Sequence, residues 1–555
     1  PCVKVSRASA QSFRGARTEL FHGIGRYLLW PSEYHLCSCG MIGSMWLTLA
    51  LVASTAAFST AAVLVSVHTE TIAHVPPEFL SVTMDAGQLF PGHFWEDNVS
   101  FPFQSKVMLS LARALSPAFF RVGGTEADKL WYDIRNCFSA DRCGGQAGNF
   151  KEAVPRGAID DLFGFARSAG YRVIFGLNAG TGPRNENKAW TPDNAAELIS
   201  FTAERYPDVS GWWELGNEPE AFLLFQHTYV GTKRLLQDFK VLRRTLQDLA
   251  PTHKVAGIDS FGNPPFVGPD GFNLLSSFLG EGGGDVLDAV TYHWYPLIGN
   301  CAGLPQSVCK RVHGFATREK AVTAAFNDTE EKFAHMQSLV EKIGKPLWLG
   351  EGALAAAGGQ DGVTNRFAST LFYLFELGQA AITGHVMVFR QCLAGAWYSL
   401  IDVHSQKPLP DYWAALLHKQ IMGTQVHQVD IPWPLRGFAH CHRSLSGSVS
   451  VLLINPTSSA RDVNLTQAKG PITLYLLTAD NPQDPLASSG VHINGKYMFA
   501  PDGAVPPIPS DTIDMAQTYS MPPYSVAFFV FDFAPCADRQ DSEHTATTAR
   551  NEILL

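Results

Sequence analysis

The sequence predicts an α/β protein in which a (β/α)8 TIM barrel is followed by a C-terminal β-sandwich, on two observations. First, eight short apolar runs alternate with longer amphipathic stretches, as expected for parallel strands that are buried on both faces and joined by helices. Second, beyond residue 424 short strand-like runs follow one another without a convincing helix, which is typical of a sandwich. The eight runs are FLSVTMDA (79–86), AFFRVGGT (118–125), YRVIFGLN (171–178), GWWELGNE (211–218), KVAGIDS (254–260), DAVTYHWY (288–295), PLWLGE (346–351) and GHVMVFRQ (384–391).

The stretches between these runs carry the spacing of helices. In residues 157–170 the apolar side chains recur every three to four positions, and Gly170 follows as a C-terminal stop signal. The same spacing recurs in 233–249, 327–344 and 364–378. Strand and helix therefore alternate around the predicted barrel.

The second domain is predicted from three runs rich in β-branched and aromatic residues, Val449–Ile454, Thr473–Leu477 and Val526–Phe531, which Pro, Gly and Asn turns separate. Cys441 and Cys536 are expected to tie its first and last strands together. The predicted division is 77–420 for the catalytic barrel, 69–76 with 421–537 for the sandwich, and 538–555 for a polar, disordered tail.

The N-terminal 68 residues divide into two parts. Residues 1–40 form an irregular extension, whereas 41–68 are apolar and uncharged. Two alternatives fit the second part: a signal peptide cleaved around Ser54–Ala62, or an uncleaved signal anchor in which Trp46–Val67 gives the protein a membrane association. The small residues favour cleavage. We expect a secreted or lysosomal protein, which is membrane-anchored if the leader is retained.

Composition excludes several classes. The chain of 555 residues is 46% hydrophobic, and its net charge of −9 argues against a nucleic-acid-binding surface. None of the ten cysteines lies in a repeated C-x-x-C pair, so neither a structural metal nor a cofactor is expected. Loop disulfides Cys137–Cys143 and Cys301–Cys309 in an oxidising compartment fit better. Glycosylation signals at Asn98, Asn327 and Asn464 agree with secretion.

Two glutamates end apolar runs at corresponding positions. Glu218 ends GWWELGNE, and Glu351 ends PLWLGE 133 residues later (351 − 218). The strand ends of a (β/α)8 barrel meet at one rim, where the functional residues gather. Two carboxyl groups there can hydrolyse a glycosidic bond, because one gives a proton to the leaving oxygen while the other attacks the anomeric carbon. A single glutamate at a strand end is more often an ion-pair partner, but the coincidence of two favours catalysis.

The Gly-Asn-Glu-Pro motif at 216–219, together with the second glutamate, resembles the retaining barrel glycosidases. More narrowly, the chain resembles the heparanases, endo-β-glucuronidases that cut heparan sulfate. The resemblance covers most of 75–536 and implies that Glu218 is the acid/base and Glu351 the nucleophile. The matching segments are FLSVTMDA, LARALSPAFFRVGGT, VIFGLNA, WELGNEP, VTYHWY, PLWLGE, FRQ and PLPDYW.

The resemblance also implies the residues that bind substrate, a heparan sulfate or a related polysaccharide that contains glucuronate. Asn217 would bind the 2-hydroxyl of the sugar, and Tyr295 with His293 would lie beside the nucleophile. Asp85 would reach a sugar hydroxyl, and Thr125 would line the rim. The glucuronate carboxylate would be bound by backbone N–H groups of Ala357, Gly358 and Gly359 and by Tyr398.

Two departures from the heparanase pattern bear on activity. Only about two dozen residues join strand two to the next helix, so we expect a single chain without an excised linker. The segment after strand five has no Lys or Arg, which leaves few partners for sulfate groups. A less sulfated substrate or exo-β-glucuronidase activity is therefore an alternative, and a non-catalytic heparan sulfate-binding relative, expected to have lost a glutamate, is another. The basic candidates near the cleft are Lys151, Arg184, Lys188, Lys310 and Arg311.

Overall fold

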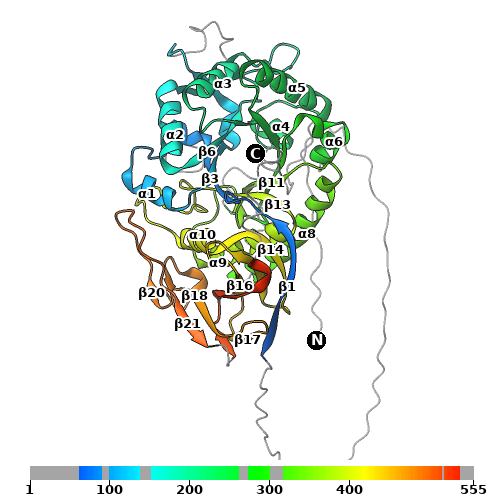
Figure 1. Ribbon diagram of the computed structural model, residues 1–555. Coiled ribbons are helices and arrows are strands. Elements are labelled where there is room, and N and C mark those ends of the chain that lie inside the picture. Colours follow the sequence, from blue (N-terminus) through cyan, green and yellow to red (C-terminus); the bar gives the residue numbers. More distant parts are fainter. Residues whose placement is uncertain are drawn as a thin grey trace, which may run out of the picture. The chain divides into compact units, whose positions relative to one another are not determined.

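Eight parallel strands close into a barrel, which confirms the predicted fold class (Figure 1). The computed structural model describes residues 62–90, 99–137, 150, 152–261, 273–299, 317–514 and 518–537. In order around the barrel the strands are β2 (Leu80–Asp85), β3 (Ala118–Gly123), β6 (Tyr171–Leu177), β7 (Trp212–Leu215), β8 (Lys254–Phe261), β9 (Ala289–Trp294), β11 (Leu347–Gly352) and β13 (His385–Arg390). Each coincides with one of the eight apolar runs.

Several predictions fall outside the described residues. They concern the extension 1–40, nearly all of the leader and the tail 538–555. The same holds for Cys143, Cys301, Cys309, Asn98, Lys151, Lys310 and Arg311.

Helices surround the barrel strands (Figure 1). Helix α9 (Phe367–Ile382) is buried on nearly every side, because it contacts strand β13 as well as the C-terminal sheet. An all-round apolar sequence such as FASTLFYLFELGQAAI is what such a position requires. None of the described helices is both long enough and apolar enough to span a bilayer. The other helices are α1 (Lys106–Ala114), α2 (Arg156–Ala169), α3 (Asp193–Arg205), α4 (Phe222–Phe225), α5 (Thr232–Leu249), α6 (Leu274–Gly280), α8 (Arg318–Glu341) and α10 (Pro410–Ile421).

The barrel interior is layered, with apolar side chains beneath polar ones. Phe119, Trp212 and Trp348 belong to a buried cluster to which every barrel strand except β2 contributes, and the two indole rings lie 4.6 Å apart. Because side chains alternate along a strand, residues two positions further on point into the same interior, one layer nearer the carboxyl ends. Those positions hold Arg121 and Glu214, so charge begins directly above the apolar layer.

The C-terminal domain is built from an eleven-stranded sheet arrangement, in which strand β1 (Val63–His74) lies between β14 and β17. Residues 66–74 of β1 pair with β14 (Met422–Asp430), whereas 63–65 pair with β17 (Arg461–Leu465). The strand therefore begins at Val63 rather than 69. The remaining strands are β15 (Arg436–His442), β16 (Ser448–Asn455), β18 (Pro471–Ala479), β19 (Val491–Ile493), β20 (Lys496–Tyr497), β21 (Asp511–Asp514), β22 (Tyr519–Met521) and β23 (Ser525–Asp532).

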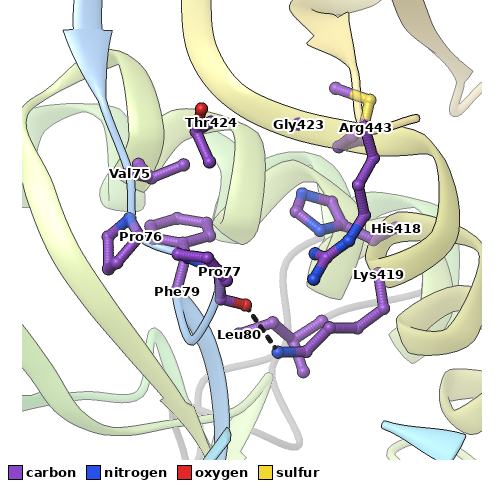
Figure 2. A pocket seen from close by; sticks show the side chains of 11 residues that line it. Val75, Pro76, Pro77, Phe79, Leu80, His418, Lys419, Gly423, Thr424 and Arg443 are labelled. Atoms are coloured by element: carbon purple, nitrogen blue, oxygen red, sulfur yellow. Dashed lines mark hydrogen bonds between the residues drawn. The ribbon is translucent and has the colours of Figure 1, made fainter. Parts of the chain in front are cut away.

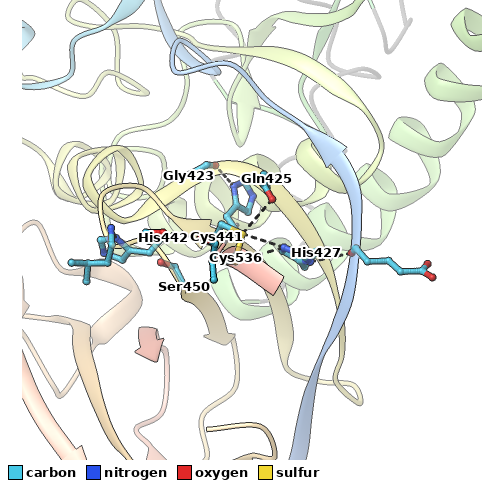
Figure 3. Close-up of a disulfide and its surroundings, with 12 residues drawn as sticks. Gly423, Gln425, His427, Cys441, His442, Ser450 and Cys536 are labelled. Carbon is cyan, nitrogen blue, oxygen red and sulfur yellow. Dashed lines mark hydrogen bonds between the residues drawn. A yellow bond between two sulfur atoms is a disulfide. The ribbon is translucent and has the colours of Figure 1, made fainter. Parts of the chain in front are cut away.

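A disulfide joins Cys441 to Cys536 across this domain (Figure 3). Cys441 lies in β15 and Cys536 follows β23, so the bond ties the second strand of the C-terminal segment, not its first, to the end of its last. The ring of His427 lies beside it, with Nε2 3.3 Å from the Cys441 sulfur. Cys137 is also disulfide-bonded.

A small cavity lies at the end of the barrel where the strands begin (Figure 2). Lys419 of α10 reaches into it and donates hydrogen bonds to the carbonyl oxygens of Pro77 and Pro117. Burial first, and then the nearby Arg443, lower the pKa of Lys419 to about 7. Leu80, the first residue of β2, lines this cavity, so it is at the opposite end of the barrel from the predicted glutamates.

Candidate active site

Glu218 and Glu351 meet at the carboxyl ends of β7 and β11. Glu351 is the fifth residue of β11, and Glu218 follows β7 after a two-residue turn. Their side chains are only 13% and 6% exposed, and one oxygen of each lies within 4.8 Å of the other and of a ring nitrogen of His293. The two carboxyl groups are therefore neighbours in a largely buried site.

The backbone of Glu218 has an unusual conformation. Its φ of 50° and ψ of 61° are left-handed, a region that a non-glycine residue occupies only where the surroundings impose it. Its N–H donates to the carbonyl oxygen of Asp259 on β8, at 3.0 Å. The following Pro219 begins a short 3-10 turn, Pro219–Ala221. These restraints fix the direction in which the Glu218 side chain points.

His293, at the end of β9, lies between the two carboxyl groups. Its Nδ1 is 2.9 Å from Glu218 Oε1 and 3.0 Å from Glu351 Oε2. Its Nε2 faces Asp259 Oδ1 at 3.6 Å. Burial alone would lower the pKa of His293, but Glu351 and hydrogen bonds to the carboxylates raise it well above its usual range. The ring is therefore an imidazolium that holds the acidic side chains together.

Arg121 lies beneath the pair as a second buried cation. It is 1% exposed, donates from Nε to Glu214 at 2.8 Å, and places Nη1 3.6 Å from Glu351 Oε1. Burial opposes its charge, yet the carboxylates of Glu214, Asp259 and Glu351 raise its pKa above the usual value. The same two cations hold the pKa of Asp259 below its usual range although burial alone would raise it.

Asn217 is oriented by two donors from β3 and the residue that follows it. Its side-chain oxygen accepts from Arg121 Nη2 and from the Gly124 N–H, both at 3.1 Å. These two bonds fix the side-chain oxygen as the acceptor, so the side-chain nitrogen of Asn217 can donate to a ligand. Gly124 has a φ of 89°, and a Cβ there would lie 2.5 Å from Asp85 Oδ2, so only glycine lets Asp85 approach this closely. Thr125 follows directly and is partly exposed.

A left-handed turn and two tyrosines form a further wall. Ala357, Gly358 and Gly359 have φ values of 59°, 78° and 78°. A Cβ on Gly359 would lie 3.0 Å from the backbone nitrogen of Tyr398, so the turn packs tightly on that residue. The ring of Tyr398 stacks near that of Tyr295, at 6.2 Å between centroids. Burial raises the pKa of Tyr398, as do the charges of Glu351 and Asp85, which places its hydroxyl in the same electrostatic environment as the glutamates.

The pKa of Glu218 is raised. Burial is the largest cause, and the charge of Glu351 adds to it, whereas the hydrogen bond and charge of His293 and the charge of Arg121 oppose it. A carboxyl group with a raised pKa keeps its proton in mildly acidic solution, which a proton donor must do.

Metal binding is not supported at the two described clusters with suitable ligand spacing. One is Glu218, His293 and Glu351, and the other is His427 with the two disulfide cysteines. His293, whose pKa is raised, would first have to lose its proton to bind a metal, and disulfide sulfurs carry no thiolate.

Asn217 and His293 lie beside the two glutamates or the ion network around them, and Tyr295, Tyr398 and the 357–359 turn pack together. Two findings differ from the sequence expectations. Arg184, a basic candidate for the cleft, is buried and paired with Asp238 at 2.8 Å, so it is not available for sulfate. Arg121 and Asp259 are central to the site, yet neither was singled out from the sequence. A charged residue inside each of the runs AFFRVGG and KVAGIDS is the signal that could have found them.

Comparison with known proteins gives the relationship. The profile of "Glycosyl hydrolase family 79, N-terminal domain" matches residues 93–378, just over half of the chain. The chain belongs to glycosyl hydrolase family 79. The predicted relationship to the heparanases and to barrel glycosidases is thereby confirmed.

Individual family 79 relatives agree. Heparanase of Gallus gallus is 30% identical over 519 residues, covering 83% of this chain and 93% of that protein. Hyaluronoglucuronidase of Hirudo nipponia is 27% identical and covers 83% of this chain and 95% of that one. The solved structure of a 4-O-alpha-L-rhamnosyl-beta-D-glucuronidase from Fusarium oxysporum superposes with a TM-score of 0.62 at 16% identity, over 84% of this chain and 99% of that one, and supports the fold alone.

Proposed function

We propose that this family 79 member is a retaining endo-β-glucuronidase that cleaves glucuronate-containing glycosaminoglycans of the heparan sulfate type. The observation that carries the proposal is the approach of Glu218 and Glu351, whose nearest oxygens lie within 4.8 Å. Carboxyl groups about 5–5.5 Å apart act by double displacement, whereas inverting enzymes need room for a water between groups about 6.5–9.5 Å apart.

The reaction proceeds in two steps. In the first, the Glu351 carboxylate bonds to the anomeric carbon while the bond to the leaving oxygen breaks and Glu218 gives that oxygen its proton. In the second, Glu218 takes a proton from water, and the resulting hydroxide attacks the same carbon and releases Glu351. Two inversions leave the configuration unchanged.

The surroundings suit these two roles. Glu351 has a ring nitrogen of His293 3.0 Å from Oε2 and the guanidinium of Arg121 3.6 Å from Oε1. Glu218 has its pKa raised by burial and by Glu351. The amide of Asn217, whose oxygen is already bound, would donate from nitrogen to the 2-hydroxyl of the sugar, a contact that strengthens in the transition state.

Recognition of glucuronate would involve the wall described above. Backbone N–H groups of a left-handed turn form a concave site for an anion. The residues from Ala357 to Gly359 form such a turn, with the Tyr398 ring packed against it. Asp85 and Thr125 would contact the remaining hydroxyls.

The basic residues near the site bear on how strongly sulfated a polysaccharide the enzyme accepts. Of the five basic candidates, two lie among the described residues: Arg184 is engaged in an ion pair, and Lys188 is exposed. We therefore propose that weakly sulfated stretches are preferred. Hyaluronan, an unsulfated glucuronate polymer, is the comparison substrate because one relative is named hyaluronoglucuronidase.

We further propose that the protein works outside the cytosol, secreted or in lysosomes. The disulfide between Cys441 and Cys536 supports an oxidising compartment during folding.

Chemical rescue tests the roles separately. Glu351→Ala should lose nearly all hydrolysis of a chromogenic β-glucuronide, because several kcal/mol of barrier depend on the nucleophile. Azide should restore turnover and give the α-glucuronyl azide, because it enters the space of the missing carboxylate and displaces the aglycone from the α face of the anomeric carbon. In Glu218→Ala, azide should give the β-azide, because the glycosyl-enzyme still forms. Wild-type-like activity in either variant, or the opposite anomers, would exclude the assignment.

Product lengths decide between endo and exo action. An endo enzyme shortens heparan sulfate or hyaluronan chains to a ladder of intermediate sizes from the first minutes. An exo-β-glucuronidase releases single glucuronate residues and leaves long chains nearly unchanged. Release of monosaccharide alone would replace the endo proposal by the exo alternative.

A further inference from the structure

Trp397, in the loop between β13 and α10, leaves a large aromatic surface in solvent. Trp397 is 43% exposed. Among the described residues, Trp433 is the only other exposed tryptophan, at 71%. An indole ring combines a broad apolar face with one polar N–H group. That is the surface on which sugar rings stack.

The backbone that carries this ring is held firmly. The Trp397 N–H donates to the carbonyl oxygen of Gly358 at 2.9 Å, and the Trp397 carbonyl accepts from Thr364 Oγ1 at 3.0 Å. The next carbonyl, that of Tyr398, accepts from Arg390 Nε at 3.1 Å and Nη2 at 2.8 Å. A ring on so fixed a backbone loses little conformational freedom when it binds a ligand.

The position of Trp397 is defined by its neighbours. Its backbone bonds to Gly358 of the left-handed turn, and the residue after it, Tyr398, is 5% exposed and stacks near Tyr295. Two consecutive aromatic residues are thus divided between the inside of the site and its edge. In the proposed function the turn and Tyr398 bind the carboxylate at C5 of the reacting glucuronate.

The chemistry of the substrate sets what lies beside that carboxylate. In a glucuronate that is linked through O4, the preceding sugar is attached at C4, directly next to C5. We propose that Trp397 is a stacking platform for this preceding sugar, and that the contact favours cleavage inside a chain over removal of a terminal residue. The inference rests on the proposed function, because the reacting sugar defines the orientation.

Comparison of a short substrate with a long one tests the proposal. A chromogenic β-glucuronide has no preceding sugar, so Trp397→Ala should leave its kcat/KM within about twofold of wild type. On heparan sulfate or hyaluronan chains, kcat/KM should fall about tenfold, which corresponds to about 1.4 kcal/mol. Trp397→Phe, which keeps an aromatic face, should recover most of that loss.

Trp433→Ala is the matched control, because it removes an exposed tryptophan between β14 and β15, within the sheet domain. Trp433→Ala should leave kcat/KM unchanged for both the chromogenic β-glucuronide and the polysaccharide chains. Equal losses on both substrates in Trp397→Ala, or no loss on chains, would overturn the proposal.

Binding separates this proposal from the proposed function. In Glu351→Gln, quenching of tryptophan fluorescence by hyaluronan and heparan oligosaccharides should disappear when Trp397→Ala is added. If the wild type hydrolyses neither substrate but this quenching is present, the proposed function fails and the subsite stands. If no oligosaccharide binds, the subsite fails whatever the small glucuronide shows.

Discussion

Replacing His293 by glutamine should move the alkaline limb of the pH–rate profile upward. Glu218 must be protonated to donate to the leaving group, so the loss of its proton sets that limb. The hydrogen bond and charge of His293 lower the pKa of Glu218 and oppose the effect of burial. Without the imidazolium the Glu218 pKa rises, and activity persists to higher pH even though its maximum is lower.

The size of the shift follows from the geometry. An opposite charge within about 4–6 Å moves a carboxyl pKa by about 1–3 units. The imidazolium is shared among three carboxyl groups, with contacts of 2.9 Å to Glu218, 3.0 Å to Glu351 and 3.6 Å to Asp259. We therefore expect the lower end, about one pH unit, equivalent to about 1.4 kcal/mol.

The assay is kcat/KM for a chromogenic β-glucuronide between about pH 4 and pH 9. His385→Gln is the control, because His385 is equally buried but bonds to Tyr292 at 2.8 Å and not to the glutamates. It should leave the limb in place. An unchanged or downward-shifted limb in His293→Gln would refute the reasoning.

Three further changes probe other parts of the molecule. Arg121→Met strands the buried carboxylate of Glu214, so the free energy of unfolding should fall by about 3–5 kcal/mol, and a loss below about 1 kcal/mol in denaturant titrations would contradict the ion network. Replacing Cys441 and Cys536 by serine opens a loop of 95 residues and should lower the free energy of unfolding by about 4–5 kcal/mol. The kcat for the small glucuronide should stay unchanged, so a lower kcat in the fully folded variant would count against this prediction. Gly359→Ala places a methyl group 2.5 Å from a threonine oxygen at a φ of 78°, so kcat/KM for glucuronides should fall at least about tenfold, whereas normal kinetics would show that the turn does not form the carboxylate site.

Much of the barrel was predictable because its strands are short, apolar and buried on both faces. An apolar sequence led to a wrong prediction at the start of β1, which begins at Val63 and not at residue 69. Val65 and Val67 are fully buried in the sheet domain, but from the sequence they read as the end of an apolar leader. Strand and leader share one composition, and only the distant pairing partners distinguish them.

The site was predictable where a strand ends in a carboxylate, and not where a charge lies inside the barrel. Glu218 and Glu351 each interrupt an apolar run at its end. In the sequence Arg121 is a single charge within an apolar strand. Its role in the site comes from ion pairs with carboxylates on β7, β8 and β11, and the sequence does not show that these strands bring the carboxylates beside it. For Arg184 the sequence prediction was wrong in the opposite direction. Its polar loop sequence suggested a free cation near the cleft, but the side chain is buried against Asp238.

The pairing of β1 has a consequence for how the protein is made. Ser66 of this strand pairs with Asp430, which leaves the ribosome 364 residues later (430 − 66). At about 5–20 residues per second the nascent chain keeps an unpaired strand for about 20–70 seconds. An exposed strand edge of that kind promotes aggregation. The whole barrel must therefore emerge before β1 finds its partner strand, so the yield of folded protein should depend on chaperones that shield this one strand.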